Sequence, residues 1–353
     1  MIRDSTQKLV DRANLTYEES REVMKEIMQG QATDAQIAAF LTALRMKGET
    51  VEEITAFAEI MKEYSTRIHP HVNGRLIDTC GTGGDKIKTF NVSTAAAFVV
   101  AGAGVAIAKH GNRSVTSHSG SADVLEKLGF NLSMPADAVQ SSIEQVGIGF
   151  MFAPAFHPAM KYAIGPRREI GIRTIFNVLG PLTNPACANA QVVGVYDRKL
   201  TVPLAHALKS LGCEEAMVVH GLDGLDEIST VGKTAIAWLR QGEVKTIETA
   251  PRDFGVKHAT ITAVKGTTPE ESAEILFKTL NGHCATDDAK RNMVLVNAAA
   301  GIVVDGKAEN FKHGMDLSRE SIDSGAAYTK LKALIKASGG DLSKLEELES
   351  KYA

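Results

Sequence analysis

Little in this sequence points toward nucleic acid or a membrane. Aromatic residues make up 5% of the 353 residues, too few for the stacked platforms that bind single-stranded nucleic acid. The formal net charge of -3 gives no general basic field, so nucleic-acid binding would need a local patch. The longest apolar run, residues 95–108, contains two glycines and is too short to cross a bilayer. We therefore expect neither a nucleic-acid partner nor a membrane partner.

The cysteines argue against a disulfide-rich or zinc-binding protein. None of the four forms a CxxC pair, which favours reduced thiols over a disulfide framework or a zinc site. The first twelve residues are polar and lack the apolar segment of a secretory signal. With 44% hydrophobic and 23% charged residues, the composition is that of an ordinary globular protein. We expect a cytoplasmic protein with two domains.

Residues 1–66 are predicted to form a small, all-helical N-terminal domain. Three capping boxes mark helix starts, at Thr16–Glu19, Thr33–Gln36 and Thr50–Glu53. Gly30 and Gly48 stand where C′ residues would end two of these helices. Apolar residues recur at helical spacing on the last two helices. We expect these apolar faces to pack against the larger domain or against a second subunit.

Residues 67–74 have no periodicity and contain a proline and a terminal glycine, as a linker or hinge does. His69 and His71 could form a metal-ligand pair. However, no third ligand is near them in the sequence, and solvated histidines are the simpler interpretation.

Residues 75–353 are predicted to form a large α/β domain with a mostly parallel central sheet, because strand-like and helical segments alternate. The expected strands cover residues 76–77, 105–108, 148–152, 190–195, 216–219, 235–239 and 244–247. The expected helices cover residues 94–102, 121–128, 136–146, 200–211, 270–281 and 287–304, with a solvated helix in 341–353. The short turn at 241–242 indicates an antiparallel edge.

Three polar loops in this domain suggest phosphate binding. Residues 81–85, Gly-Thr-Gly-Gly-Asp, match neither the dinucleotide fingerprint nor the Walker loop, yet let a backbone approach a phosphate; a plain tight turn is the alternative. Residues 91–94 precede an alanine-rich helix and either cap it or offer N–H groups and hydroxyls to a diphosphate or hydrated Mg²⁺. Residues 109–117 combine a lysine, an arginine and three hydroxyl residues at the end of a strand, a mixture that a surface loop seldom needs.

These motifs carry a resemblance to a known family. The sequence is similar to the anthranilate phosphoribosyltransferases of the tryptophan pathway in their GTGGD, NxST and KHGNRxxSSxxGSADVLExLG motifs, with Thr116 at one of the serine positions. The similarity continues through residues 151–154, 157–161, 167–169, 173–177, 179–182, 184–185 and 226–227. It extends over essentially the whole chain.

The resemblance implies transfer of the 5-phosphoribosyl group of phosphoribosyl pyrophosphate (PRPP) to anthranilate, and a homodimer formed through the helical domain. It implies catalytic roles for Lys109, Asp226 and Glu227. It places Mg²⁺ at Ser93, Asp226 and Glu227, and anthranilate at Gly81, Asn112 and Arg167. The implied PRPP-binding residues are Gly81, Gly84, Asp85, Thr89, Asn91, Val92, Ser93, Thr94, Lys109, His110, Gly111, Asn112, Arg113, Ser114, Val115, Thr116, Ser117 and Ser121.

Residue chemistry agrees with these roles but leaves alternatives open. Adjacent carboxylates at 226–227 suit a hard cation, although an ordinary turn has the same composition. Arg167 can pair bidentately with a carboxylate, or be a surface charge beside Arg168. His110 and His157 are interpreted as structural, because attack by a neutral aromatic amine does not require a general base.

Two rivals are weighed against this interpretation. A pyrimidine nucleoside phosphorylase shares the broad fold and opens on a glycine-rich loop, but lacks the 109–117 pattern and the 167–177 run. A related nucleic-acid-binding protein would have a basic surface and would lack substrate residues, whereas this sequence is acidic and keeps Asn112 and Arg167.

Overall fold

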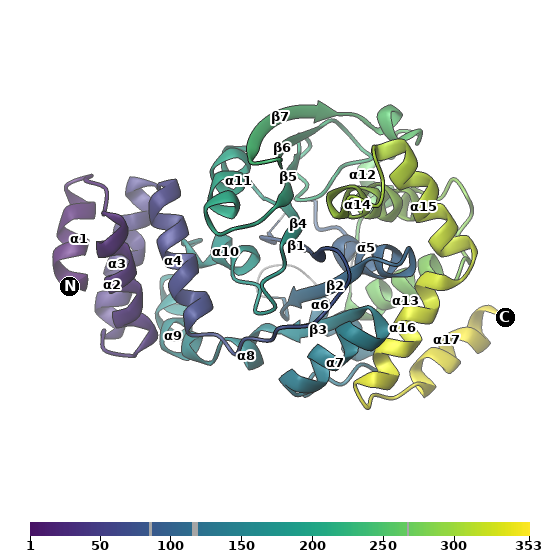
Figure 1. Cartoon of the computed structure of the whole chain (residues 1–353), viewed down its shortest axis with the longest axis horizontal. Helices are drawn as coiled ribbons and strands as arrows, with labels where there is room; N and C mark the ends of the chain where they lie inside the picture. The colour runs from purple at the N-terminus through teal and green to yellow at the C-terminus, as the bar shows by residue number, and fades with distance from the viewer. Residues whose placement is uncertain (85–86, 115–118, 267) are drawn as a thin grey trace.

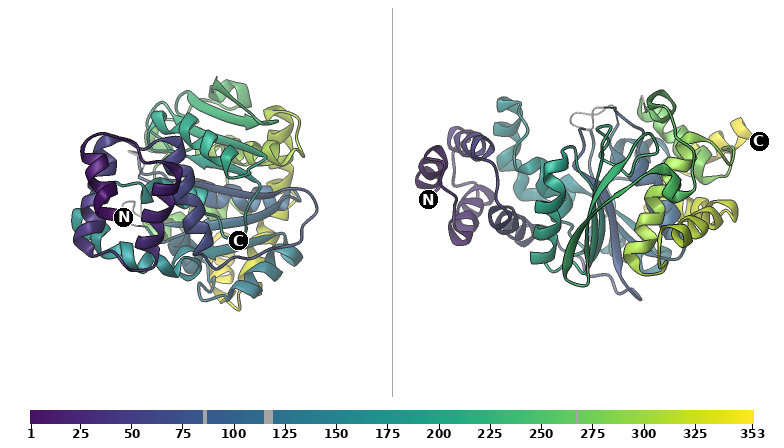
Figure 2. Two further views of the ribbon diagram at one scale, coloured as in Figure 1. Left: turned by 60° about the vertical axis from the view of Figure 1, so that its left-hand side comes forward. Right: turned by 90° about the horizontal axis from the view of Figure 1, so that it is seen from above.

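The computed structural model describes residues 1–84, 87–114, 119–266 and 268–353. Four helices open the chain, and a seven-stranded sheet with helices on both faces follows (Figures 1 and 2). The predicted fold class, a small helical domain plus a larger α/β domain with a mostly parallel sheet, is confirmed. No helix among the described residues is long and apolar enough to cross a membrane.

The N-terminal domain has four helices, and three of them begin at the capping boxes predicted from the sequence. The four helices are α1 (Ile2–Val10), α2 (Tyr17–Met28), α3 (Asp34–Lys47) and α4 (Val51–Glu63), and all three predicted capping boxes are formed. Gly30 lies one residue beyond the cap of α2 with φ +71°, as a C′ residue does. The C′ prediction for Gly48 is wrong: Gly48 is itself the C-cap of α3, at φ +90° and ψ 139°, because the chain becomes extended at once to reach the Thr50 cap.

The apolar faces of α2–α4 pack as expected against the larger domain. Their buried residues share one core cluster with side chains of α9 (Lys161–Ile170), α10 (Phe176–Leu179) and α11 (Thr201–Ser210). Tyr162 of α9 lies so close to the α2–α3 turn that a Cβ on Gly30 would be 2.5 Å from its ring. The helix α9, although distant in sequence, therefore packs against the N-terminal helices and lies near α2 and α3 in Figure 1.

Glu53 is the buried ionic centre of the helical unit. It is fully buried, accepts hydrogen bonds from the N–H groups of Leu15 (2.9 Å) and Thr50 (2.8 Å), and pairs with the ammonium of Lys47 at 2.8 Å. Glu53→Ala leaves the Lys47 ammonium with a neutral partner only, the Asn14 side chain at 3.0 Å, and leaves two N–H groups without their acceptor. We therefore expect the free energy of unfolding to fall by about 3–5 kcal/mol. Urea denaturation measures this change.

The exposed Glu52, next to it on α4, provides the matched control. Glu52→Ala is expected to change the free energy of unfolding by less than about 0.5 kcal/mol. Equal effects of the two substitutions would contradict the assigned role of Glu53.

The central sheet has the strand order β3-β2-β1-β4-β5-β6-β7. The first five strands pair in parallel, while β5, β6 and β7 pair antiparallel, which confirms the predicted antiparallel edge. The strands are β1 (Leu76–Gly81), β2 (Ala106–Gly111), β3 (Ile148–Phe152), β4 (Ala190–Gly194), β5 (Glu215–Gly221), β6 (Thr234–Arg240) and β7 (Glu243–Thr249). Every strand predicted from the sequence is present.

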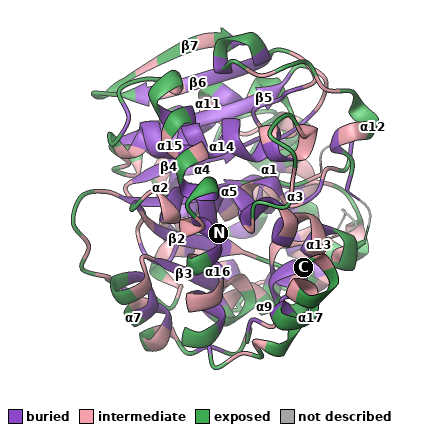
Figure 3. Ribbon diagram, turned by 90° about the vertical axis from the view of Figure 1, so that its right-hand side faces the viewer, coloured by how far each residue is buried: buried purple, intermediate pink, exposed green. Residues whose placement is uncertain are grey.

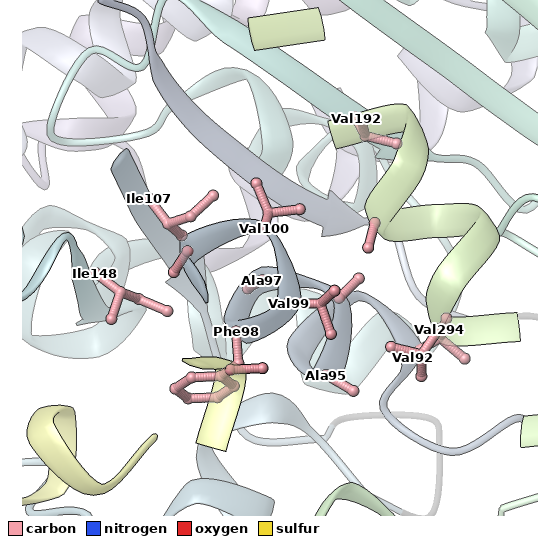
Figure 4. Close-up of a cluster of buried hydrophobic side chains, with 14 of the residues drawn as sticks. Val92, Ala95, Ala97, Phe98, Val99, Val100, Ile107, Ile148, Val192 and Val294 are labelled. Carbon is pink, nitrogen blue, oxygen red and sulfur yellow. The ribbon is translucent and has the colours of Figure 1, made fainter. Parts of the chain in front are cut away.

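Helices cover both faces of this sheet. Neighbouring strand residues point to opposite sides: Val192 joins the core with α5 and α14, and Val193 joins the core with α11. α5 (Val92–Gly102) and α14 (Ala289–Asp305) are almost wholly buried (Figure 3), and Figure 4 shows the side chains of α5 among those of β2, β3, β4 and α14. This packing fixes the first turn of α5 beside the ends of the strands.

The remaining helices lie at the edges and on the outer surface. The predicted ones are α6 (Ser121–Lys127), α7 (Ala136–Val146), α13 (Pro269–Leu280) and α17 (Ser343–Tyr352). Six helices were not predicted from the sequence: α8 (Ala153–Phe156), α9, α10, α12 (Ile261–Val264), α15 (Phe311–Asp323) and α16 (Ala326–Ala337). Three of these have four residues each, too short to show a period, and α9 contains Pro166.

The linker lies against α7. The N–H groups of His69 and His71 donate to the side chains of Gln140 (3.0 Å) and Glu144 (2.9 Å). In the part of the chain that the structure describes, no group of three His, Cys, Asp or Glu side chains could hold a metal ion, so these histidines belong to no such cluster.

Candidate active site

A cleft of about 310 Å³ opens at the carboxyl ends of the central strands. β2 and β3 extend the sheet on one side of β1, and β4 and β5 extend it on the other, so β1 and β4 form the topological switch point. Open α/β sheets bind ligands at such a point. The loops after β1, β2 and β5 meet there, together with α9, α10 and the short turn after α10.

Two facing glycines let an acidic loop enter this switch point. Gly81 and Gly194 are partners across β1 and β4. A Cβ on Gly81 would lie 3.0 Å from a carboxylate oxygen of Asp226, and one on Gly194 would overlap the Asp226 backbone at 1.6 Å. The absence of side chains at both positions therefore allows the 226–227 loop to lie across the strand ends.

The first turn of α5 meets the same loop. The Ser93 N–H donates to a Glu227 carboxylate oxygen at 3.2 Å, and the Thr79 hydroxyl donates to the Ser93 carbonyl at 2.9 Å. Asn91 is the N-cap residue, but its side chain does not cap the helix and instead donates to the Ser119 carbonyl at 3.2 Å. The capping alternative for this side chain is thus wrong.

Two buried oxygens at this helix end have no hydrogen-bond partner among the described residues. They are Oδ1 of Asn91 and Oγ1 of Thr94, and both residues line the cleft. Buried polar atoms are rarely left unsatisfied, so a polar ligand is the natural partner for them. The positive end of the α5 dipole favours an anion in the same place.

Lys109 is a buried cation beneath the cleft. Its ammonium group donates to the Thr79 carbonyl at 2.5 Å, and burial lowers its pKa, an effect that the nearby Asp78 carboxylate opposes. Burial raises the pKa of Asp78 to about 6, against the stabilising Lys109 charge and a 2.7 Å hydrogen bond from the Asn184 amide. Asp78 was not predicted as a site residue, although an acidic residue that follows two apolar strand residues was a usable signal.

The loop that begins at Lys109 is held from behind. Asp123 accepts the N–H groups of Ser114 (3.0 Å) and Gly120 (2.9 Å), closing the loop onto the start of α6. Arg113 lines the cleft, yet its guanidinium pairs with Glu126 (2.8 Å) and Asp123 (3.0 Å), which raises its pKa. Its charge is therefore shared with two carboxylates.

Arg167 and Arg168 differ in exposure. Arg167 is half-buried and lines the cleft with its guanidinium 5.1 Å from the centre of the Phe176 ring, whereas Arg168 is exposed. Burial lowers the pKa of Arg167. A half-buried cation at the wall of a pocket suits the carboxylate of a ligand, so the structure favours Arg167 over the surface-charge alternative.

His110 and His157 pack against each other, with ring centroids 5.0 Å apart. Burial lowers the pKa of His110 to about 3 and that of His157 to about 4. Both imidazoles are therefore neutral near pH 7. This agrees with a structural role.

These two histidines should make the protein less stable in acid. Their folded-state pKa values lie below the usual 6.5, so the unfolded chain binds more protons. The free energy of unfolding therefore falls as pH decreases from about 6.5 toward about 4 for His157 and toward about 3 for His110. At pH 5 each histidine lowers the free energy of unfolding by about 2 kcal/mol. Asp78, whose pKa is raised, opposes this by about 1 kcal/mol because it binds its proton more readily when folded.

Urea denaturation at pH 7 and pH 5 measures the loss. His157→Phe should reduce the difference between the two pH values by about 2 kcal/mol, and the exposed His206→Asn is the control. An unchanged difference in His157→Phe would contradict the assignment.

Every predicted site residue that the structure describes lines this one cleft. These are Gly81, Gly84, Thr89, Asn91, Val92, Ser93, Thr94, Lys109, His110, Gly111, Asn112, Arg113, Ser114, Ser121, Arg167, Asp226 and Glu227. Asp85, Val115, Thr116 and Ser117 lie outside the described residues. Four further residues line the cleft and were not predicted as site residues, because they come from α10 and the turn after it: Phe176, Asn177, Gly180 and Pro181.

Comparison with known proteins identifies the class. Residues 3–65 match the helical bundle domain of a glycosyl transferase family, and residues 73–328 match the α/β domain of a glycosyl transferase family. The fold and the cleft are thus those of a glycosyl transferase.

The relatives narrow this class. The chain is 52% identical over 342 residues to the anthranilate phosphoribosyltransferase of Pelotomaculum thermopropionicum, with 96% of this chain and 97% of that protein covered. The enzyme of that name from Thermus thermophilus has a similar solved structure (TM-score 0.88, 40% identity, 95% and 99% covered). So does the enzyme from Saccharomyces cerevisiae in complex with PRPP and Mg (TM-score 0.88, 30% identity, 96% and 98% covered). The chain belongs to the anthranilate phosphoribosyltransferase family.

Proposed function

We propose that the cleft at the β1–β4 switch point carries out the reaction of this family, with the residues described above in defined roles. The chain is a Mg²⁺-dependent pentosyltransferase of tryptophan biosynthesis. It transfers the 5-phosphoribosyl group of PRPP to the amino group of anthranilate, giving N-(5-phosphoribosyl)anthranilate and pyrophosphate. The observation that carries the residue assignments is the convergence of the phosphate-binding motifs, Arg167 and the 226–227 pair on one cleft.

The phosphate groups of PRPP are assigned to the loop after β1, the first turn of α5 and the loop after β2. As the ribose C1–O bond breaks, negative charge builds up on the departing diphosphate. The Lys109 ammonium and the positive end of the α5 dipole are fixed in place before the reaction, so they stabilise that charge without reorganising. The unsatisfied oxygens of Asn91 and Thr94 can accept hydrogen bonds from ribose hydroxyls.

Mg²⁺ is assigned to Ser93, Asp226 and Glu227. Two carboxylates and a hydroxyl beside a phosphate site are hard oxygen donors, which fit an ion that takes one or two carboxylates and completes its shell with phosphate and water. Glu227 approaches the Ser93 backbone and Asp226 lies against Gly81, so the three residues are close together. When bound, the ion would neutralise diphosphate charge.

Anthranilate is assigned to the side of the cleft formed by Gly81, Asn112 and Arg167. Arg167 would bind the carboxylate, Asn112 the amino group, and the bare backbone of Gly81 would separate anthranilate from PRPP. Holding the amine in line with C1 supplies the orientation part of catalysis.

Arg167→Ala is expected to raise the KM for anthranilate about 10- to 100-fold with a smaller change in kcat, because it removes a charge-assisted pair made to bound substrate. The assay follows the loss of anthranilate fluorescence in the presence of PRPP and Mg²⁺, with and without a chelator. The exposed Arg168→Ala is the matched control. A wild-type chain that binds PRPP but leaves anthranilate unchanged would refute the proposed acceptor.

We also propose that residues 1–66 form a dimerisation domain, that 67–74 act as a hinge, and that 75–353 form the catalytic domain of a cytoplasmic homodimer. Three exposed apolar residues support a protein contact there: Met1, which precedes α1, Val10 on α1 and Met46 on α3. The four free cysteines are compatible with a reducing compartment. Sedimentation of Val10→Glu/Met46→Glu as a monomer would support the dimer assignment, and an unchanged sedimentation coefficient would refute this face.

A further inference from the structure

Arg173 lies in the turn between α9 and α10 and reaches the glycine-rich loop after β1. Its Nη2 donates a 2.6 Å hydrogen bond to the carbonyl of Gly84, and its guanidinium carbon is 4.2 Å from the centre of the Tyr196 ring. A planar guanidinium can donate to a carbonyl while its face stacks on an aromatic ring, which an ammonium cannot do. Arg173 does not line the cleft, so it acts on the loop and not on the substrate.

Tyr196 fixes the same loop at its other end. The Tyr196 N–H donates to the Thr82 hydroxyl at 3.1 Å, and the Thr82 N–H donates to the Gly194 carbonyl at 2.8 Å. Tyr196 therefore holds the start of the loop through its backbone N–H, and it holds the end of the loop through its ring, which packs on Arg173. Tyr196 lies in the segment that follows β4 and Arg173 lies in the α9–α10 turn, so both supports are outside the loop.

Gly84 is adapted to this contact. Its φ is +81°, which favours glycine, and a Cβ there would lie only 2.7 Å from the Arg173 guanidinium nitrogen. Three glycines within residues 81–84 give the free loop a large backbone entropy, which must be lost when phosphate binds. A hydrogen bond to one carbonyl of this loop removes part of that cost in advance.

We propose that Arg173, supported by Tyr196, is a positioning residue that holds the 81–84 loop in the shape that binds PRPP. Arg173 also links the PRPP side of the cleft to the anthranilate side. Its turn directly follows α9, the helix that carries Arg167. This inference rests on the assignment of PRPP to that loop in the proposed function.

The first test compares Arg173→Ala and Arg173→Lys in the full-length protein by calorimetric PRPP binding with Mg²⁺ and by steady-state kinetics. Arg173→Ala should weaken PRPP binding and raise the PRPP KM about 10- to 100-fold, with a smaller change in the anthranilate KM. Arg173→Lys keeps the charge and a hydrogen-bond donor but loses the stacking on Tyr196, so it should weaken PRPP binding only about 2- to 5-fold. Arg168→Ala, which removes an exposed arginine from the preceding helix, is the control.

Double variants test the geometry. Gly84→Ala should impair PRPP binding in the wild-type background and less so with Arg173→Ala, where the 2.7 Å conflict is gone. Tyr196→Leu should weaken PRPP binding more than Tyr196→Phe does, because phenylalanine keeps the aromatic ring that stacks on Arg173. A merely structural role would instead give additive losses and equal effects on both substrates.

The possible failures are distinguishable. If wild-type protein binds PRPP and Arg173→Ala binds it equally well, the inference is overturned while the proposed function stands. If wild-type protein does not bind PRPP, the proposed function fails first. Should Arg173→Ala not fold, PRPP binding by Arg173→Lys equal to that of Arg168→Ala overturns the inference, and weaker binding supports it.

Discussion

Asp226→Asn/Glu227→Gln is expected to lower kcat about a thousand-fold at low Mg²⁺, because it removes both carboxylates assigned to the ion that neutralises the diphosphate. An ion that stabilises a leaving group contributes several kcal/mol, and about 4 kcal/mol corresponds to this factor. Both substitutions conserve side-chain size, so the close contacts of Asp226 with Gly81 and of Glu227 with Ser93 can persist. Initial rates over a Mg²⁺ titration measure the effect.

The Mg²⁺ dependence separates a metal role from a folding role. The double variant should need a much higher Mg²⁺ concentration for half-maximal rate, and its melting temperature should stay near that of the wild type. Glu271→Gln, on the exposed side of α13, controls for loss of a negative charge. Normal turnover by the double variant at low Mg²⁺ would remove Asp226 and Glu227 from the metal site.

Lys109→Met is expected to lower kcat about 100- to 1000-fold, the usual cost of removing one fixed group that stabilises charge in a transition state. Methionine retains the length and apolar stem of the side chain but has no positive charge. Because the substitution also leaves Asp78 buried without its cation, we expect an additional loss of stability of about 3 kcal/mol.

A second substitution distinguishes these two effects. Lys109→Met/Asp78→Asn removes both charges and should recover much of the stability measured by urea denaturation, while kcat stays low. The exposed Lys199→Met is the control for loss of a lysine. If the double variant recovered activity along with stability, Lys109 would have only a structural role.

The three capping boxes of the helical domain were predictable to the residue. Each capping box at Thr16, Thr33 and Thr50 is a pair of hydrogen bonds between residues three apart, so its formation depends on a few neighbouring side chains. The existence of each strand was also predictable, but not its bounds: residues 76–77 were predicted where β1 spans Leu76–Gly81, because polar residues follow the first two apolar ones. The failures, such as the four-residue α8 and α10, lacked a repeat long enough to detect.

For the site, the sequence supplied the residue types, and the family resemblance supplied their roles. Clusters such as residues 109–114 are contiguous, so their polar character alone suggested phosphate. Arg167 was different, because an arginine next to Arg168 in the sequence could equally be a surface charge. Only the packing of α9 against the rest of the chain places Arg167 at the cleft and leaves Arg168 exposed.

Sequence by itself thus determined the helical start, the α/β alternation and the phosphate-binding loops, because these depend on interactions between close neighbours in the chain. Tertiary structure alone decided which distant groups meet: Ser93 with Glu227, 134 residues apart, and Arg173 with Gly84, 89 residues apart. The physical reason is that strand order and the close approach at Gly81 and Gly194 set these contacts. Neither is encoded in any single segment, since both arise only when the whole sheet packs between its two layers of helices.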